Sequence, residues 1–499
     1  MLYAVFKNIG CRLNQSETEA LAHFFLKAGF GVCAQPDNSA HVIIVFVNTC
    51  TVTTKAEQKC RHVIRSSLKS FPNAIIIVSG CYAQLESKRI ESIDERVVTF
   101  PGMQKGFLKY FPDFLQKSLK IKESTYDTTN ISDTILLPER SDIRQIVYAF
   151  IQTLPSTKQM TENEKKPLSV LTGQPVFTPL VKTHLLGQHR QNPSVANVKE
   201  KPQYAFELST SDFVFRSRAT IKVQDGCNSS CSFCRIHKAR GSSVSLEIKK
   251  VVQRAQEIEK AGKNEIVLTG VNVSQYRDGS AHFSDLLKQL LLQTTHIHFR
   301  ISSFYPEAID QEFVEVFADK RVCPYIHLSV QSGSERILKY MRRPSSVQHI
   351  EAVCDTLKKV KPDTFIGADI IAGFPSETEE DFQKTLELCT RVQFQHIHAF
   401  PFSARPDTEA FYFKPRVPEK TIAERVALLN ALSEKNYKSY MALIIGKTFF
   451  GIVEDFSDGL KVLTENYVLL PLKQEKNTDK LKSGDGVFVK VCDSYCILA

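Results

Sequence analysis

Short apolar runs alternate along most of this chain with longer stretches in which apolar residues recur at helical spacing. In the first 100 residues such runs occupy positions 3–6, 41–47 and 74–78, and each precedes a helical pattern. Unbroken runs rich in Val and Ile are typical of parallel strands that are buried on both faces. The pattern therefore predicts an N-terminal parallel α/β domain, to which we assign residues 1–131.

A second series of apolar runs and helical stretches fills the middle of the chain, where we expect a domain at 213–440. The runs lie at 219–223, 265–270, 298–302, 325–330, 364–371 and 396–400. Strands that alternate regularly with helices indicate a parallel α/β sheet. Polar residues and glycines follow several of these runs, at the carboxyl ends of strands where ligands usually bind.

The last segment, 441–499, has short alternating runs separated by turns that contain Gly or Asp, which predicts a small β-barrel. Such a barrel can bind nucleic acid through basic residues, and four lysines are available for this role: Lys447, Lys461, Lys473 and Lys476. The alternative is that these lysines only solvate the surface of the barrel.

Between residues 132 and 212 the periodic pattern lapses. This stretch contains many Gln, Pro and Lys residues and cannot bury much apolar surface. We expect it to be an insert or linker that is mobile.

Three cysteines directly after the apolar run 219–223 most constrain the chemistry. Cys227, Cys231 and Cys234 have the spacing C-x3-C-x2-C. Three thiolates can hold three corners of a cubic iron-sulfur cluster and leave one iron open for a ligand. The alternatives are a zinc site closed by His237, and disulfide pairing.

Cysteines also follow the three apolar runs of the N-terminal region, at Cys11, Cys50 and Cys81. Because the carboxyl ends of parallel strands meet at one edge of a sheet, we expect these cysteines to converge on a second cluster site. Taken singly, each could also be a small buried side chain.

Composition fits a large enzyme of about three domains in 499 residues. No apolar run reaches the ~18–20 residues of a membrane span, and the N-terminus lacks a signal-peptide pattern, so we expect a cytoplasmic protein without membrane association. Thirteen cysteines in that compartment favour metal binding over disulfides. The formal charge of +10 suits a polyanionic partner, although a basic surface without a partner is the alternative.

The C-x3-C-x2-C segment resembles the signature of the radical S-adenosylmethionine (SAM) enzymes. That resemblance implies a [4Fe-4S] cluster whose open iron binds the methionine part of SAM, and reductive cleavage to a 5′-deoxyadenosyl radical. It also implies that Phe233 lies beside the adenine of SAM, whereas the alternative for Phe233 is a core aromatic.

Segments 10–20, 48–53 and 80–84 closely resemble the three ligand segments of the methylthiotransferases, which belong to the radical SAM enzymes and carry a second [4Fe-4S] cluster. The resemblance implies a partial (β/α)6 barrel in the middle of the chain and a TRAM-like β-barrel at its end. It further implies that one SAM methylates sulfur held at the N-terminal cluster and that another is cleaved to the radical.

The motif Cys-x2-Asn-x2-Glu that starts at Cys11 resembles most the branch acting on N6-threonylcarbamoyladenosine at position 37 of tRNA. The product implied is 2-methylthio-N6-threonylcarbamoyladenosine. Two other substrates stay open within the family, N6-isopentenyladenosine in tRNA and an aspartate of a ribosomal protein. A rival of another class is a non-catalytic tRNA-binding protein that holds zinc at its cysteines.

Other positions match family segments near the SAM site and are expected to contact that cofactor: Gly270, Asn272, Ser302, Gln331 and Asp369. The family implies tRNA as substrate and an electron donor such as flavodoxin or ferredoxin, while the sulfur donor is not indicated. Segment 401–408 departs from the family pattern because Phe402 replaces a tyrosine and Asp407 a glycine, and His237 stands where relatives have proline. Arg405 is expected either to contact a carboxylate or phosphate or to form a surface ion pair.

Overall fold

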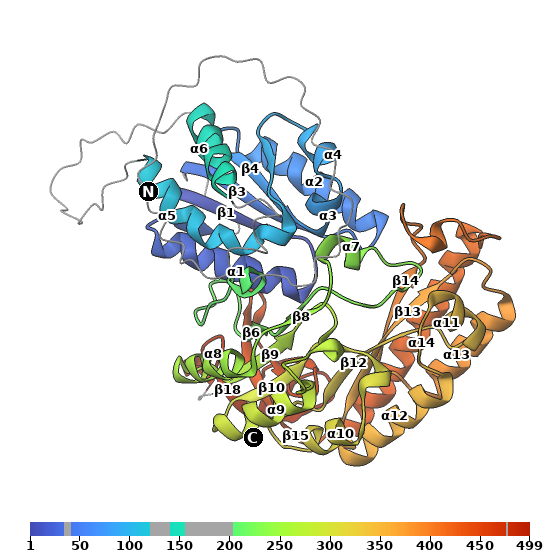
Figure 1. Cartoon of the computed structure of the whole chain (residues 1–499). Helices are drawn as coiled ribbons and strands as arrows, with labels where there is room; N and C mark the ends of the chain where they lie inside the picture. Colours follow the sequence, from blue (N-terminus) through green and yellow to red (C-terminus); the bar gives the residue numbers. More distant parts are fainter. Residues whose placement is uncertain (34–40, 120–139, 155–202, 476–477) are drawn as a thin grey trace. The chain divides into compact units, whose positions relative to one another are not determined.

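The computed structural model describes residues 1–33, 41–119, 140–154, 203–475 and 478–499 (Figure 1). The chain divides into two units. The smaller unit consists of residues 1–9, 21–49 and 60–208, and the larger unit of residues 10–20, 50–59 and 209–499. The segments that follow Cys11 and Cys50 therefore group with the larger unit.

A five-stranded parallel sheet forms the centre of the smaller unit, in the order β2-β1-β3-β4-β5. The strands are β1 (Leu2–Asn8), β2 (Gly31–Cys33), β3 (His41–Thr49), β4 (Ile75–Gly80) and β5 (Val97–Thr99). Every residue of β3 after His41 and every residue of β4 is buried, as the Val and Ile runs predict for strands covered on both faces. The predicted N-terminal parallel α/β fold is confirmed.

Helices follow these strands at the positions where the sequence shows helical periodicity. They are α1 (Arg12–Lys27), α2 (Thr54–Ser70), α3 (Cys81–Leu85), α4 (Ser87–Glu91) and α5 (Phe111–Leu119). Helix α3 starts at a cysteine, immediately after β4. The end of each strand and the start of the next helix thus flank the cysteine segments.

One helix of the smaller unit lies within the expected insert 132–212. Helix α6 (Arg140–Thr153) buries an apolar face that includes Phe150, whose ring centroid lies 5.1 Å from that of Phe111. The sequence analysis did not anticipate this helix. Positions 132–139 and 155–202 of the insert lie outside the described residues. The prediction that the insert is mobile falls mostly on these positions.

The larger unit contains a curved row of parallel strands, and its described part has seven of them, of which the third and fourth share one position in the row. The strands are β6 (Ala219–Lys222), β9 (Glu265–Thr269), β10 (His298–Ile301), β11 (Ser303–Phe304), β12 (Tyr325–Gln331), β13 (Phe365–Ala372) and β14 (His396–Pro401). They form two sheets, β6-β9-β10 and β11-β12-β13-β14, and only Ser302 separates β10 from β11.

Helices connect these strands and cover their outer side (Figure 1). They are α8 (Ile248–Lys260), α9 (Phe283–Gln293), α10 (Gln311–Phe317), α11 (Glu335–Met341), α12 (Val347–Val360), α13 (Glu379–Val392) and α14 (Glu419–Ile444). This alternation is the partial (β/α)6 barrel implied by the resemblance, with its strand ends at one rim.

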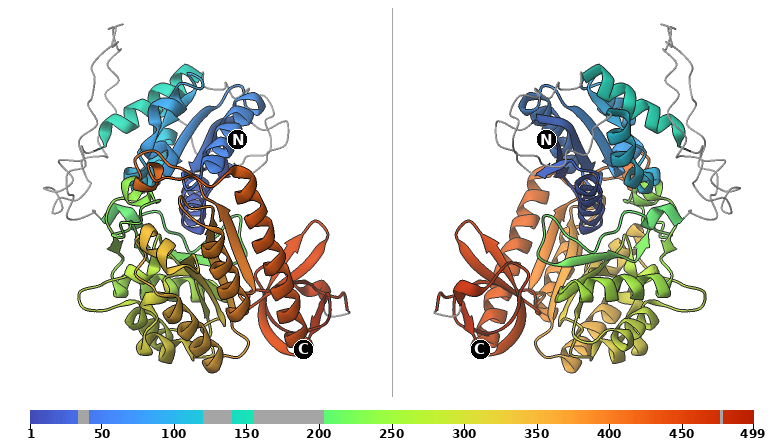
Figure 2. Two further views of the ribbon diagram at one scale, coloured as in Figure 1. Left: turned by 90° about the vertical axis from the view of Figure 1, so that its right-hand side faces the viewer. Right: turned by 90° about the vertical axis from the view of Figure 1, so that its left-hand side faces the viewer.

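A curled antiparallel sheet follows α14, as the sequence predicts for a small β-barrel (Figure 2). Its order is β17-β16-β15-β18-β19, formed by β15 (Thr448–Phe456), β16 (Gly459–Thr464), β17 (Leu469–Pro471), β18 (Gly486–Val491) and β19 (Cys496–Leu498). Tyr325 and Phe365, at the starts of β12 and β13, belong to the same apolar core as these strands. The C-terminal sheet thus shares its core with the barrel.

Candidate active site

The loop that carries Cys227, Cys231 and Cys234 is closed at its base by a short β-ladder. Strand β7 (Gln224–Asp225) pairs with β8 (Val244–Ser245), and the backbone N–H of Cys227 donates to the carbonyl of Gly241 at 3.0 Å. Gly226 has φ 73°, and a Cβ there would lie 1.9 Å from the carbonyl oxygen of Ser242. Only glycine permits this close approach, which sets the start of the cysteine loop.

Hydrogen-bond donors surround the three thiols. Backbone N–H groups of Ser229 and Ile236 lie 3.4 Å from the sulfurs of Cys227 and Cys234, respectively. The Arg343 guanidinium lies 3.9 Å from the sulfur of Cys231, whose pKa is raised by burial and lowered in part by that charge. Donors and a nearby cation are what metal-bound thiolates require, and such contacts also tune the potential of an iron-sulfur cluster.

The spacing of the thiols argues against the zinc alternative. In a tetrahedral zinc site with Zn–S bonds of about 2.3 Å, the sulfurs lie about 3.8 Å apart. Among the described residues, only one group of three His, Cys, Asp or Glu side chains has all its ligand atoms within 4.8 Å, and it contains none of these cysteines and not His237. The three thiols therefore do not form a group of that compactness.

Arg343 and Tyr305 form one wall beside the cysteines. The guanidinium of Arg343 lies 3.8 Å from the centroid of the Tyr305 ring and donates to the carbonyl of Ser329 at 2.9 Å. Burial raises the pKa of the Tyr305 hydroxyl, and the charges of Cys231, Cys227 and Cys234 raise it further. The sequence analysis missed both residues, because neither belongs to a motif and both reach the cysteines only through the fold.

Gln224 fixes the loop after β9, which contains the predicted SAM contacts Gly270 and Asn272. Its side-chain oxygen accepts hydrogen bonds from the backbone N–H groups of Val271 at 3.0 Å and Asn272 at 2.9 Å. A Cβ at position 270 would lie 2.8 Å from that oxygen, so glycine permits the approach. Gln224 is a further residue that the sequence analysis missed.

Two buried polar atoms near this loop have no partner within the described protein. They are the side-chain oxygens of Asn272 and Ser302. The amide of the same Asn272 lies 3.9 Å from the sulfur of Cys227. A buried polar atom without a partner costs free energy unless a ligand satisfies it. Both residues therefore fit the predicted role of binding a polar cofactor beside the cysteines.

The remaining predicted SAM contacts have varied surroundings. Gln331 ends β12 with a φ of 76°. Asp369 contacts two histidines, which are described below. Phe233 packs edge-on against Phe374, with centroids 6.5 Å apart, and joins an apolar cluster. For Phe233 this is the core-aromatic alternative, and its contact with adenine stays a prediction.

The strands that precede Cys11, Cys50 and Cys81 end side by side. Asn48 of β3 pairs with Asn8 of β1 and with Ser79 of β4. Cys50 and Cys81 directly follow their strands, and Cys11 comes three residues after β1 ends. Gly80 has φ 102°, and a Cβ there would lie 2.3 Å from the carbonyl oxygen of Thr49. Convergence of the three sulfurs stays a prediction that this topology supports.

Buried charges in the larger unit surround the segment that follows Cys11. Glu17 accepts from Lys222 at 2.9 Å and from Arg240 at 3.3 Å, and both cations also contact Asp225. Arg240 further donates to the side-chain oxygen of Asn14 at 2.5 Å. Asn14 and Glu17 are the Asn and Glu of the Cys-x2-Asn-x2-Glu motif. These two residues of the motif therefore have a structural role, because they bind the buried cations.

Arg405 contacts the segment that follows Cys50, just as Arg240 contacts the segment that follows Cys11. Its guanidinium is buried, pairs with Glu57, and donates to Thr54 at 2.9 Å and Thr51 at 3.1 Å. The expectation of a surface ion pair is wrong, because this pair is internal. Nearby Asp407 has φ 64°, a left-handed conformation that glycine adopts without strain, which accounts for the glycine of relatives at this position.

The Radical SAM superfamily profile matches residues 221–389, and that of the Uncharacterized protein family UPF0004 matches residues 3–102. The threonylcarbamoyladenosine tRNA methylthiotransferase MtaB of Treponema pallidum (strain Nichols) is 42% identical over 99% of this chain and 98% of its own length. The protein of the same name from Thermotoga maritima is 32% identical over 93% and 86%, respectively.

The chain belongs to the threonylcarbamoyladenosine tRNA methylthiotransferase family. The family resemblance seen in the cysteine segments is thereby confirmed. By contrast, tRNA-2-methylthio-N(6)-dimethylallyladenosine synthase of Desulfotalea psychrophila is 27% identical over 91% of this chain and 88% of its own length. Other relatives that bear the threonylcarbamoyladenosine name are 28–32% identical, so it is the 42% identity to the Treponema pallidum protein that favours the branch predicted from the motif at Cys11.

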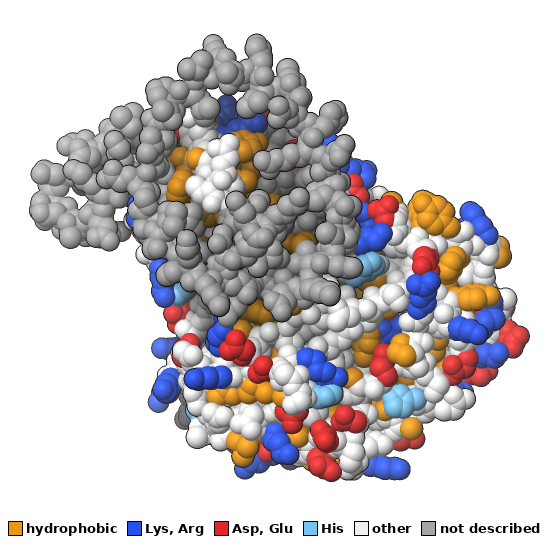
Figure 3. Space-filling model, viewed as in Figure 1, with side chains coloured by type: hydrophobic (Ala, Val, Ile, Leu, Met, Phe, Trp, Pro, Cys, Tyr) orange, Lys and Arg blue, Asp and Glu red, His pale blue; other side chains and the backbone are white. Residues whose placement is uncertain are grey.

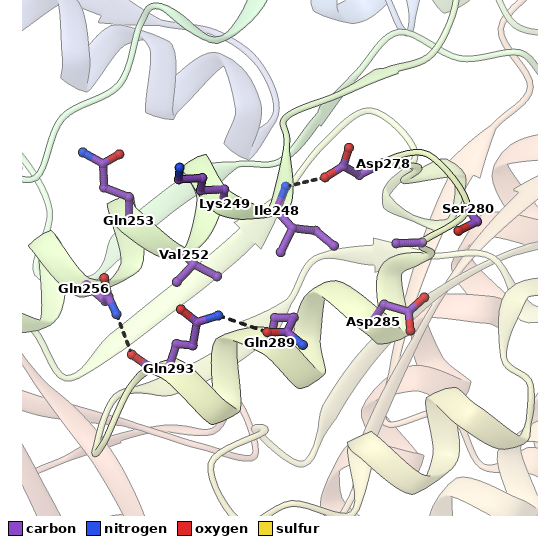
Figure 4. A pocket seen from close by; sticks show the side chains of 11 residues that line it. Ile248, Lys249, Val252, Gln253, Gln256, Asp278, Ser280, Asp285, Gln289 and Gln293 are labelled. Carbon is purple, nitrogen blue, oxygen red and sulfur yellow. Dashed lines mark hydrogen bonds between the residues drawn. The ribbon is translucent and has the colours of Figure 1, made fainter.

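A groove of this methylthiotransferase lies away from the cysteines, between α8 and α9 (Figure 4). It has a volume of about 830 Å³, and Gln256 and Gln293 on its wall are joined by a hydrogen bond of 2.9 Å. None of the predicted site residues lines it. The lining residues are Ile248, Lys249, Val252, Gln253, Gln256, Asp278, Ser280, Ala281, Asp285, Gln289 and Gln293.

Charge on the visible face of the methylthiotransferase is mixed. In Figure 3 blue and red side chains alternate over the described part of the larger unit, without one large basic area. Two of the lysines predicted for nucleic-acid binding have acidic partners, Lys447 with Asp363 at 2.5 Å and Lys461 with Asp458 at 2.8 Å. Lys476 lies outside the described residues. No described helix is long and apolar enough to cross a membrane.

Proposed function

We propose that this chain adds a methylthio group to C2 of N6-threonylcarbamoyladenosine at position 37 of tRNA, and that the product is 2-methylthio-N6-threonylcarbamoyladenosine. The 42% identity to a relative of that name over the whole chain carries the proposal. The cysteine loop at the rim of a partial (β/α)6 barrel supplies the chemistry that such a transfer requires.

Cys227, Cys231 and Cys234 hold a [4Fe-4S] cluster in this proposal. When the cluster and SAM are bound, they supply a 5′-deoxyadenosyl radical able to abstract hydrogen from the adenine carbon. The protein contributes the N–H donors of Ser229 and Ile236, which stabilise the thiolates, and the fixed charge of Arg343 beside Cys231.

The protein also binds and orients SAM. Gln224 holds the backbone at Gly270 and Asn272, and the unpartnered side-chain oxygens of Asn272 and Ser302 accept hydrogen bonds from the cofactor. Gln331, at the end of β12, completes the polar rim, whereas Asp369 is engaged with the two histidines that it contacts. Phe233 and the aromatic rings packed with it exclude water from one side of the cysteine loop, which protects a reactive radical.

Cys11, Cys50 and Cys81 hold the second [4Fe-4S] cluster, at which sulfur is kept for transfer. Support comes from the aligned ends of β1, β3 and β4. Each cysteine follows one of three adjacent strands, and the carboxyl edge of a parallel sheet is where ligands usually bind.

We divide the chain into a cluster domain at 1–131, an insert at 132–212, a radical SAM domain at 213–440 and a TRAM-like β-barrel at 441–499 that contacts tRNA. The last boundary lies near the end of α14 at Ile444, and β15 begins at Thr448. Reducing equivalents come from a protein donor such as flavodoxin or ferredoxin. The enzyme works in the cytoplasm, where its tRNA substrate is found.

Mass spectrometry of tRNA nucleosides tests the activity. Cells that lack the chain are compared with cells that regain it, or regain Cys227→Ala, with Cys492→Ala as a control remote from both cysteine sets. We expect the wild type and the control to restore 2-methylthio-N6-threonylcarbamoyladenosine, and Cys227→Ala to fail. An unchanged level of that nucleoside, with loss of the methylthiolated isopentenyl nucleoside instead, would contradict the proposed substrate.

A further inference from the structure

Two histidines and an aspartate converge from three adjacent strands of the barrel. They are His327 of β12, Asp369 of β13 and His398 of β14. His327 Nε2 lies 2.9 Å from Asp369 Oδ1, and His398 Nδ1 lies 3.3 Å from the same oxygen. Their three ligand atoms all lie within 4.8 Å of one another.

The strand register produces this arrangement. Asp369 pairs directly with His398, whereas His327 pairs with Gly367, two residues before Asp369 on the same face of β13. A Cβ at position 367 would lie 2.5 Å from His327 Nδ1, so the glycine makes room for the imidazole. The ring of His398 packs at 3.9 Å, centroid to centroid, on that of Phe400. Rigid strands and packed rings therefore hold the group.

We propose that His327, Asp369 and His398 bind a divalent first-row metal ion of the zinc class. Ligands at about 2.0–2.1 Å from a tetrahedral zinc lie about 3.3 Å apart. The His398–Asp369 separation of 3.3 Å equals this value, and the His327–Asp369 separation of 2.9 Å would have to widen by about 0.4 Å. Two imidazoles and one carboxylate are a ligand set that zinc and its neighbours in the first row bind.

The group is partly buried and open to solvent on one side. The side chains of His327 and Asp369 are 12% and 21% exposed, respectively. The His398 side chain is 52% exposed, which leaves access for an ion and for a water or other ligand as its fourth partner.

This site is distinct from the cysteine clusters in its donor atoms, since it offers nitrogen and oxygen but no sulfur. Its existence does not depend on the methylthio-transfer reaction. A test must therefore separate zinc bound by these side chains from zinc bound by thiols.

The experiment uses the full chain, reconstituted anaerobically with both iron-sulfur clusters, equilibrated with zinc chloride and desalted. Zinc and iron are counted by mass spectrometry for the wild type, Asp369→Asn, His398→Ala and the control His396→Ala. We expect about one zinc per chain in the wild type and in His396→Ala. Asp369→Asn and His398→Ala should bind zinc at least tenfold more weakly, with iron unchanged in all four proteins.

X-ray absorption at the zinc edge identifies the ligands. The wild type should show nitrogen and oxygen scatterers at about 2.0–2.1 Å rather than sulfur at about 2.3 Å. Equal zinc in His398→Ala and wild type, sulfur in the first shell, or no zinc in the wild type would each overturn the proposal. The iron count reports separately on the fold and the clusters, so loss of folding in a variant is recognised.

Discussion

Arg240 and Asp225 form a buried ion pair, with 3.0 Å between Nη1 and Oδ1. Glu17 and Lys222 complete the group, so that two cations face two anions inside the larger unit. Charges removed from water are tolerated when each has a partner of opposite sign and satisfied hydrogen bonds. The segment that follows Cys11 is held in place by this balance.

Glu17→Gln upsets that balance, because it leaves two buried cations with one carboxylate. We expect the free energy of unfolding to fall by about 3–5 kcal/mol. Urea unfolding of the cluster-loaded protein measures it. The control is Glu434→Gln, which removes the exposed partner of Lys438 and should leave the free energy of unfolding nearly unchanged. Equal losses in the two variants would contradict the role of the buried group.

The two cysteine sets should respond differently to substitution. We expect both Cys11→Ala and Cys227→Ala to lower the iron content to about half, because each removes a ligand of one of two clusters. Only Cys227→Ala should abolish reductive cleavage of SAM. Iron analysis and assay of 5′-deoxyadenosine check this, and loss of cleavage in Cys11→Ala would argue against separate duties of the clusters.

Gln224 acts on SAM through the loop that it holds. In Gln224→Ala the backbone N–H groups at 271 and 272 lose their acceptor, a change worth about 1–3 kcal/mol, which corresponds to SAM binding about 5- to 150-fold weaker. Calorimetry with the reconstituted protein measures the affinity. Gln253→Ala, in the outer groove, serves as the matched control and should bind SAM like the wild type.

His298 should make stability depend on pH. Its ring lies 4.1 Å from that of Phe450, centroid to centroid, and burial lowers its pKa to about 4. The unfolded chain protonates this residue near pH 6.5, whereas the folded protein keeps it neutral. The contribution of neutral His298 to the free energy of unfolding is complete above about pH 6.5. It declines as the pH falls to about 4, by at most about 1.4 kcal/mol per pH unit.

His298→Gln should therefore flatten the change in unfolding free energy between pH 7 and pH 5. Urea unfolding at the two pH values measures this change. The neighbouring His296 is exposed, and His296→Gln should leave the pH dependence of the wild type intact. If the unfolding free energy of His298→Gln changed with pH as it does in the wild type, His298 would not be the source of the pH dependence.

Local patterns were enough to predict the strands and the cysteines. Buried parallel strands need runs of Val and Ile, and a cysteine at the end of such a run is visible in the sequence. The contacts made by Arg343, Gln224 and Arg405 could not be predicted. Arg343 lies 112 positions from Cys231 along the chain, and no periodicity links the two.

Two other differences have the same physical origin. Helix α6 has an ordinary amphipathic face. It was not predicted because the sequence around it is rich in polar residues. For Arg405 the sequence shows a charge near a surface-like segment, whereas burial depends on Glu57, which is 348 positions away. Long-range pairing decides such roles, and one sequence does not reveal it.

Hydrogen bonds join the barrel to the C-terminal sheet, in addition to the apolar core that the two share. Arg300 of β10 pairs with Glu265 and donates to the carbonyl oxygens of Glu465 at 3.0 Å and Thr464 at 3.2 Å. A protein shortened to residue 440 would therefore lose acceptors for a fully buried guanidinium and uncover Tyr325. The C-terminal sheet therefore supports the barrel at the starts of β12 and β13, and removing the sheet should destabilise the barrel itself.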